Sequence, residues 1–257
     1  GGDGQVVTNP SVGRPGTVTD ARGASVTNTY YPSGLLQRTT YPEGNYVHYH
    51  RDARGNVTRT QIVGKTGGEI NTYAGFGLDC GPYPVACNKP TYTVDARGKQ
   101  TDYYYNGTPR LTEVRGPADA SGQRPTTSFE YTVIDGKHKL TRQRECSSAA
   151  SCSGSADERG TTLQYDSKGR YPVSVTVASG NGAIVSTSQF TYDARGNVLT
   201  VDGPLPGSGD TSYHFYDQRD RRRGTIGPDP DGAAEKIFAA GMTEWRRSHR
   251  EDGGLIP

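Results

Sequence analysis

The chain has 257 residues, of which 31% are hydrophobic, and a formal net charge of +2. An apolar share so far below the roughly 45–50% of ordinary domains excludes a large aliphatic core. The small net charge excludes a strong long-range field toward nucleic acid. The 17 tyrosines, 35 glycines and 16 prolines favour strands that are packed by aromatic rings and joined by frequent turns. We therefore predict an all-β protein whose sheet has one modestly apolar face and one solvated face.

A short turn recurs from the amino-terminal part of the chain onward, which indicates an internal repeat. Asp-Ala-Arg-Gly occurs at 20–23, 52–55 and 95–98, and Tyr-Asp-x-x-Gly occurs at 165–169 and 192–196. Tyr-Pro-x-Gly at 31–34 and 41–44 is interpreted as a variant with proline in the aspartate position, and Tyr216 begins a copy with aspartate in the glycine position. The residues predicted to shape these turns are Asp20, Gly23, Gly34, Gly44, Asp52, Gly55, Asp95, Gly98, Tyr165, Asp166, Gly169, Tyr192, Asp193, Gly196, Tyr216 and Asp217.

Each repeat has β-forming residues before and after the turn. An aspartate at the first position can accept hydrogen bonds from backbone N–H groups two or three residues on, and a final glycine adopts a positive φ without a Cβ clash. The glycines at 23, 34, 44 and 55 are 10 or 11 residues apart, which corresponds to one strand and one turn per step. This spacing predicts a continuous meander of repeated antiparallel β-hairpins. A residue that is repeated so often is more typical of a structural role than of catalysis.

The repeat assigns residues 1–232 to one β-sheet domain and leaves residues 233–257 as a carboxy-terminal segment. That segment is either a short helix or a truncated further repeat. No stretch approaches the roughly 18 consecutive apolar residues of a membrane-spanning helix. The sequence begins Gly1-Gly2-Asp3 without an initiator methionine, so we expect a processed chain or an internal fragment.

Four cysteines form two close pairs in turn-rich segments. Cys80 and Cys87 enclose Gly-Pro-Tyr-Pro-Val-Ala, and Cys146 and Cys152 enclose Ser-Ser-Ala-Ala-Ser. Neither spacing is the C-x2-C of zinc sites or redox motifs. We predict two local disulfides, with free buried thiols or an unusual metal site as the alternative. Local disulfides are typical of an oxidising compartment, so we expect an extracellular, cell-surface or periplasmic protein.

The segment Tyr192-Asp193-Ala194-Arg195-Gly196-Asn197-Val198 resembles the consensus of the YD-repeat, or rearrangement hot spot (Rhs), family of the bacterial shell-forming type. The stretches 116–119 and 227–232 are also similar to bacterial members, so the resemblance spans roughly residues 13–232. It implies a long curved or spiralling sheet, which in several members forms a hollow shell around a carboxy-terminal toxin. Residues 251–255, Glu-Asp-Gly-Gly-Leu, lack the proline of the family's self-cleavage motif, so the resemblance does not assign autoproteolysis to Asp252.

Few other residues could carry chemistry. His48 and His50 lie at i and i+2 of a predicted strand, so both face the same side, and with Tyr46 they could bind a metal or a ligand. The simpler interpretation places them on the solvated face. The basic clusters at 219–223 and 246–250 are interpreted as a solvated turn and terminus. We expect no catalytic residue, no cofactor and no metal site.

These features predict a non-catalytic structural module, which would act as a shell wall, a scaffold or a self-assembling fibre unit. Its partners would be further YD-repeat segments or copies of itself, joined by strand addition at unpaired sheet edges. An encapsulated toxin or a surface glycan is a further candidate partner. The alternative is a module for adhesion to glycans or cell surfaces through exposed tyrosines, and a polysaccharide-acting enzyme is less favoured. We expect no nucleic-acid partner and no membrane span.

Overall fold

The computed structural model describes residues 13–77, 87–147 and 152–228, and these residues contain seventeen β-strands and no α-helix. The prediction of an all-β fold built from antiparallel hairpins is therefore confirmed. Within each of two compact units, strands that follow one another along the chain pair antiparallel in a sheet. The predicted carboxy-terminal segment, residues 233–257, lies outside the described residues, so that boundary stays a prediction.

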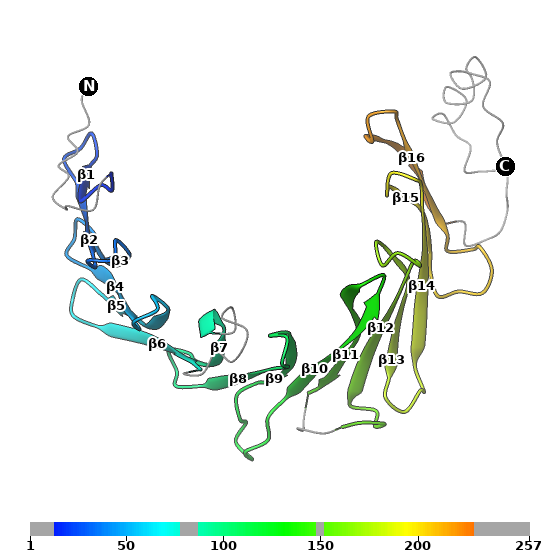
Figure 1. Cartoon of the computed structure of the whole chain (residues 1–257), viewed down its shortest axis with the longest axis horizontal. Coiled ribbons are helices and arrows are strands. Elements are labelled where there is room, and N and C mark those ends of the chain that lie inside the picture. Colours follow the sequence, from blue (N-terminus) through cyan, green and yellow to red (C-terminus); the bar gives the residue numbers. More distant parts are fainter. Residues whose placement is uncertain (1–12, 78–86, 148–151, 229–257) are drawn as a thin grey trace. The chain divides into compact units, whose positions relative to one another are not determined.

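The strands are divided between two compact units, and in each unit they follow one another in chain order (Figure 1). The first unit holds β1 (Thr17–Thr19), β2 (Ser25–Tyr30), β3 (Leu36–Thr40), β4 (Tyr46–Arg51), β5 (Val57–Val63), β6 (Glu69–Phe76), β7 (Pro90–Val94), β8 (Gln100–Tyr105) and β9 (Leu111–Arg115). The second unit holds most of β10 (Thr126–Ile134), and then β11 (Lys137–Cys146), β12 (Glu158–Tyr165), β13 (Pro172–Ser179), β14 (Val185–Tyr192), β15 (Val198–Asp202), β16 (Ser212–Tyr216) and β17 (Arg222–Ile226).

The strand register separates apolar from polar side chains in the first unit. Val47 of β4 pairs with Ile62 of β5, which pairs with Ile70 of β6, so these three residues share one face. The residues next to them along the strands, His48, Gln61 and Asn71, pair in the same way on the opposite face. This alternation follows from the two-residue period of a strand and matches the predicted contrast between the two faces.

The described part of the molecule has almost no conventional core. Its buried hydrophobic residues are Cys87 and Cys152, and no side chain among the described residues is fully buried. Several apolar side chains stay largely accessible, including Ile70 with an exposed fraction of 52% and Ile184 with 71%. Backbone pairing and contacts between neighbouring side chains within one layer therefore hold each unit, in place of packing between two layers.

Threonine and tyrosine supply much of this lateral contact. Hydroxyl pairs join Thr17 to Thr27 and Thr176 to Thr187 across neighbouring strands, with Oγ1–Oγ1 distances of 3.4 and 2.9 Å. Tyr171 stacks on Tyr192 with ring centroids 4.8 Å apart. β-Branched and aromatic side chains fit a pleated surface, so these residues stabilise strands in a chain that is poor in leucine and isoleucine.

Candidate functional site: the repeated turn and the surfaces beside it

The repeated turn is a three-residue hairpin loop closed by a β-bulge, and the turn at Asp193 shows its geometry. The backbone N–H of Asp193 donates to the carbonyl oxygen of Asn197 at 3.0 Å, and the N–H of Gly196 donates back to Asp193 at 3.1 Å. Gly196 has a φ of +95°. This is the pattern of a type I turn followed by a left-handed residue, which matches the twist of an antiparallel hairpin.

The aspartate side chain fixes the loop from inside. Oδ1 of Asp193 accepts hydrogen bonds from the backbone N–H groups of Arg195 and Asn197, both at 2.9 Å. Oδ1 of Asp193 therefore accepts from the N–H groups two and four residues on, whereas the sequence predicted donors two or three residues on. The same pair of side-chain contacts, two and four residues on, is made by Asp20, Asp52, Asp95, Asn106, Asp119 and Asp217.

The position of proline in the Tyr-Pro-x-Gly copies differs from the sequence interpretation. The N–H of Tyr31 donates to Leu35 at 2.9 Å, and the N–H of Gly34 donates to Tyr31 at 2.8 Å. Tyr31 therefore takes the aspartate position and Pro32 the second position of the turn. Placing proline in the aspartate position was wrong, because a fixed φ near −65° suits the second residue of a type I turn.

Three further copies of the turn escaped the sequence analysis. They are the loops at 64–68, 106–110 and 119–123, which close with the same backbone bond between the first and fifth residues. Asp119-Ala-Ser-Gly122 matches the motif and could have been found by it, whereas Gly64 and Asn106 replace the aspartate. In the copy at 217–221, Asp220 takes the glycine position with a φ of +58°, a conformation that aspartate tolerates better than most residues.

The tyrosine that precedes a turn ties its hairpin to an earlier segment of the chain. The hydroxyl of Tyr192 donates to the backbone carbonyl of Pro172 at 2.7 Å. Tyr30, Tyr105 and Tyr165 make the corresponding bond to the carbonyls of residues 15, 90 and 140. In each case the tyrosine lies where the strand register shifts by one residue. The bulge therefore sets the direction of the ring. Partial burial of the Tyr192 side chain also raises the pKa of its hydroxyl.

Hydrogen bonding controls the charge state of the turn aspartates. The side-chain hydrogen bond from Asn197 holds the pKa of Asp193 below its usual 3.8, against a smaller opposing effect of desolvation. For Asp52, desolvation opposes ionisation, but hydrogen bonds from Asn56 and Arg54 outweigh it and lower the pKa. Asp52 and Asp193 are thus ionised at neutral pH, and their oxygens are engaged in hydrogen bonds of the turn.

Aromatic and basic side chains lie together on the first unit around His48 and His50. The rings of His48 and His50 stack with centroids 4.2 Å apart, and Arg38 lies 3.6 Å over the ring of Tyr46. No group of three or more histidine, cysteine, aspartate or glutamate side chains that could hold a metal ion occurs among the described residues. The predicted grouping of Tyr46, His48 and His50 on one face is present, and Arg38 is the member that sequence reasoning missed.

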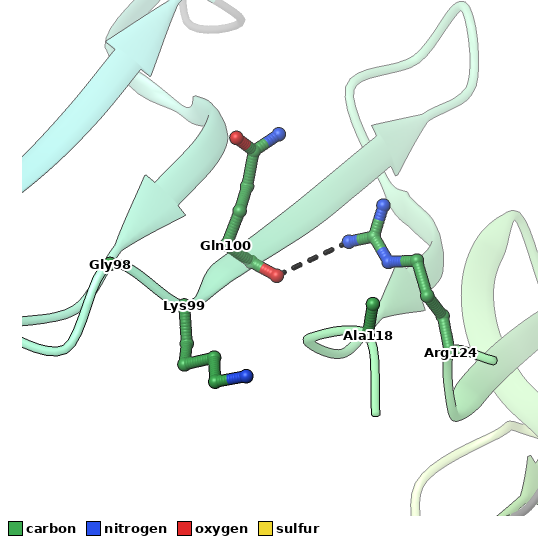
Figure 2. A pocket seen from close by; sticks show the side chains of 5 residues that line it. All are labelled: Gly98, Lys99, Gln100, Ala118 and Arg124. Atoms are coloured by element: carbon green, nitrogen blue, oxygen red, sulfur yellow. Dashed lines mark hydrogen bonds between the residues drawn. The ribbon is translucent and has the colours of Figure 1, made fainter. Parts of the chain in front are cut away.

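A shallow depression of about 410 Å³ lies beside the Asp95 turn and is shown in Figure 2. It is lined by Gly98, Lys99, Gln100, Ala118 and Arg124. The guanidinium of Arg124 donates to the carbonyl oxygens of Gly116 at 2.7 Å and Gln100 at 3.3 Å, and it forms an ion pair with Asp102. Because its donors are engaged in this way, Arg124 connects β8 to the loop after β9. No sequence motif marks this arginine.

Near the disulfide of the second unit lies a buried carboxylate. Glu158 is 3% exposed, and its Oε2 accepts a hydrogen bond from the N–H of Gly154 at 2.7 Å. Arg142 and Arg144 lie 3.6 and 3.9 Å from Oε1. A Cβ on Gly180 would lie 2.5 Å from Oε2, so only glycine fits there. Glu158 belongs to no repeat motif, and its role depends on strand pairing that the sequence does not reveal.

The second cysteine pair forms the expected bridge. The structure contains the disulfide between Cys146 and Cys152, and Cys146 pairs with Glu158 in the sheet. The other expected bridge is not described, because Cys80 lies outside the described residues, although Cys87 is buried. No helix in the described part of the chain is long and apolar enough to cross a membrane.

Comparisons with known proteins give structural likeness at low sequence identity. No protein-family model matches the chain, and no curated protein matches it. Crystal structures of TcdB2–TccC3 with Cdc42 and of TcdB2–TccC3 match 79% of this chain at 12% identity, with TM-scores of 0.42 and 0.41. The chain spans 13 and 14% of the length of those chains. A porin-like protein from Bacteroides uniformis matches 86% of this chain and 85% of its own length, at 13% identity and a TM-score of 0.37.

Proposed function

We propose that this chain is a non-catalytic structural module, a stretch of extracellular YD-repeat β-sheet that serves as part of a shell wall or scaffold. The observation that carries the proposal is the use of the repeated polar residues. The turn aspartates, the tyrosines before the turns and Arg124 direct their polar atoms into hairpin geometry and links between hairpins. Side chains arranged for catalysis would instead converge on a space that a substrate could enter.

The proposed partners rest on the near absence of a buried core among the described residues. A single layer with accessible apolar residues, such as Ile70, Ile184 and Val185, gains stability when further surface covers it. Our proposal is that further YD-repeat segments or copies of this chain extend the sheet, and that one face encloses a folded cargo such as a toxin. The Cys146–Cys152 disulfide supports an extracellular or cell-surface location, because such bridges persist in oxidising compartments.

One observation favours glycan adhesion as a second candidate. Tyr73, Tyr92 and Tyr104 are 43, 40 and 42% exposed. The register from β6 to β8 places the three rings on the same face, because Tyr73 pairs with Val94, and Tyr92 pairs with Asp102. Exposed aromatic rings in a row offer flat apolar surfaces with polar rims, which suit stacking against sugar rings.

Negative-stain electron microscopy of the untagged, natively purified chain, together with sedimentation velocity over a hundredfold concentration range, tests the structural proposal. We expect curved sheets, closed particles or filaments that grow with concentration. Monomers at every concentration would contradict self-assembly. A polysaccharide array probed with the wild type and with a Tyr73→Ala/Tyr104→Ala variant tests the adhesion candidate. Binding that the variant loses would favour adhesion, and absence of binding would remove that candidate.

A further inference from the structure

Four nitrogen-bearing side chains lie together on one face of three neighbouring strands. His48 and His50 belong to β4, and their rings stack with an interplanar angle of 9°. Arg38 of β3 pairs with His48, and Arg59 of β5 pairs with His50. Because paired residues of antiparallel strands point to the same side, the stacked rings lie between two guanidinium groups. We call these four residues the histidine–arginine strip.

Both arginines are held in place by contacts of their own. The guanidinium of Arg38 lies over the ring of Tyr46, and its Nε donates to Thr40 Oγ1 at 3.1 Å. Nε of Arg59 donates to Asn71 Oδ1 at 2.8 Å, and Arg59 Nη2 lies 2.5 Å from Glu69 Oε1. Neither guanidinium can therefore move away from the strip without losing an aromatic or hydrogen-bonding partner.

The remaining titratable groups around the strip offer little compensation for added positive charge. Tyr46 of β4 lies on the same face as the histidines. Tyr73 and Glu69 of β6 lie on this face too, beyond Arg59. The carboxylate of Glu69 already accepts hydrogen bonds from Arg59 and from Asn71 Nδ2, the latter at 2.6 Å. On β2, the residues that pair with this face of β3 are Thr27 and Thr29, which carry no charge.

We propose that the histidine–arginine strip is an acid-sensitive element, in which protonation of the stacked histidines loosens the pairing of β4 with β3 and β5. At neutral pH the lowered pKa leaves His48 uncharged, so the stack carries no repulsion between two imidazolium rings. In acid the strip holds up to four cationic groups on adjacent positions of one sheet face, and like charges on paired strands repel. This inference concerns the first unit alone and does not depend on the proposed structural function.

The direction of the pH effect follows from linkage. Desolvation lowers the pKa of His48 below the ordinary 6.5, and the charges of His50, Arg38 and Arg59 lower it further. Between pH 6.5 and the lowered value, the unfolded chain binds more protons than the folded chain. The contribution to stability is therefore fully present above pH 6.5 and falls as the pH drops through the lowered pKa.

The test combines two measurements on the full chain. The imidazole signals of His48 and His50 are followed by NMR from pH 8 to 4.5, and thermal unfolding is recorded over the same range. We expect the His48 ring to titrate below 6.5, and the Tm of the wild type to fall by about 2–4 °C more than that of a His48→Gln/His50→Gln variant. The single variant Arg38→Gln should move the His48 titration back toward 6.5.

A matched control replaces a histidine outside the strip. His214 of β16 contacts Thr225 Oγ1 through Nδ1 at 3.0 Å, and His214→Gln should keep the pH dependence of the wild type. Superposable Tm–pH curves for the wild type and the double variant would overturn the proposal. If the double variant does not fold, the wild-type titration decides alone, and titration of His48 at or above 6.5 would equally overturn the proposal.

Discussion

At the scale of single residues, carboxylates and phenol hydroxyls hold the backbone in place through hydrogen bonds to its N–H and carbonyl groups. Asp52 and Asp193 each accept two backbone N–H groups through one oxygen, and Tyr192 donates to a carbonyl in a neighbouring hairpin. A polar group that is engaged with backbone atoms in this way satisfies donors that a tight turn otherwise leaves open to water. The repeat is therefore defined by hydrogen-bonding capacity more than by side-chain volume.

Replacing a turn aspartate tests this use of the carboxylate. Asp52→Ala removes the acceptor for the N–H groups of Arg54 and Asn56 and should lower the free energy of unfolding by about 1 kcal/mol. Asp52→Asn keeps an Oδ1 acceptor and should lose less. Because hydrogen bonding lowers the pKa of Asp52, its contribution is present above pH 3.8 and is lost as the pH falls through the lowered pKa. Urea denaturation at pH 7 and in acid measures both effects, and equal stability of the Ala variant at pH 7 would contradict the expectation.

The phenol hydroxyl can be removed without changing the ring. Tyr192→Phe should cost about 1 kcal/mol, because the carbonyl of Pro172 loses its donor while the stacking on Tyr171 stays. Tyr213→Phe, at a tyrosine that is 41% exposed, is the control and should change the unfolding midpoint little. Equal midpoints for both variants would show that the Tyr192 bond does not stabilise the fold.

At the scale of elements, the turn and the bulge beside it decide which way each strand presents its side chains. The strand register shifts by one residue at four tyrosines, so each ring points to the face opposite to the one that strict alternation along the strand predicts. They are Tyr30, Tyr105, Tyr165 and Tyr192. The glycine that closes a turn has a positive φ, and at some turns it also makes room for a neighbour. Gly196, for example, lies against the ring of Tyr171.

Two glycine substitutions separate backbone strain from lost space. Gly44 has a φ of +87°, and a Cβ at this position would meet nothing within 4 Å. Gly44→Ala should therefore lower the free energy of unfolding by about 1–2 kcal/mol through the left-handed conformation alone. Gly196→Ala adds a methyl group 2.2 Å from the Tyr171 hydroxyl and should destabilise the protein more. Thermal unfolding compares the two variants, and equal losses would mean that Tyr171 moves aside freely.

The disulfide of the second unit closes a loop beside the buried Glu158. A Cys146→Ser/Cys152→Ser variant should lose about 2–3 kcal/mol of stability, because the unfolded chain regains the entropy of a small loop. Denaturant unfolding of the variant and the wild type, without reductant, measures this loss. Unchanged stability would show that Glu158 and its hydrogen bond to Gly154 hold the loop without the bridge.

At the scale of the whole molecule, the scarcity of buried apolar surface among the described residues limits the hydrophobic contribution to stability. No side chain among the described residues is fully buried, and the exposed apolar residues occur in both units. Burial of apolar surface gives the hydrophobic contribution to stability, and hydrogen bonding and disulfides carry more of the total where that burial is small. Such a layer is suited to becoming one face of something larger, as the proposed wall requires.

This balance is measurable by calorimetry. The heat capacity change on unfolding of the monomeric chain should lie well below the usual value of about 12–15 cal/mol/K per residue, because unfolding exposes little new apolar surface. Assembly that covers the faces should raise that value toward the usual range. Sedimentation first establishes that the chain is a monomer. A heat capacity change in the usual range for that monomer would contradict the description of an exposed layer.

Much of the fold could be predicted because its signals are local. The spacing of Gly23, Gly34, Gly44 and Gly55 gave the hairpin length, and β-forming runs between turns gave the all-β class. The copies at 64–68 and 106–110 escaped because glycine and asparagine replace the aspartate while the backbone loop stays the same. A motif search detects side chains, whereas the turn itself is defined by φ and ψ angles.

The sequence by itself determined the repeated hairpin and the Cys146–Cys152 bridge, because each depends on residues close together in the chain. The tertiary structure alone decided which residues meet across strands. The placement of Arg38 and Arg59 beside the stacked histidines, the buried site of Glu158 and the links made by Arg124 depend on strand register. A shift of one residue in that register would move every side chain of a strand to the opposite face.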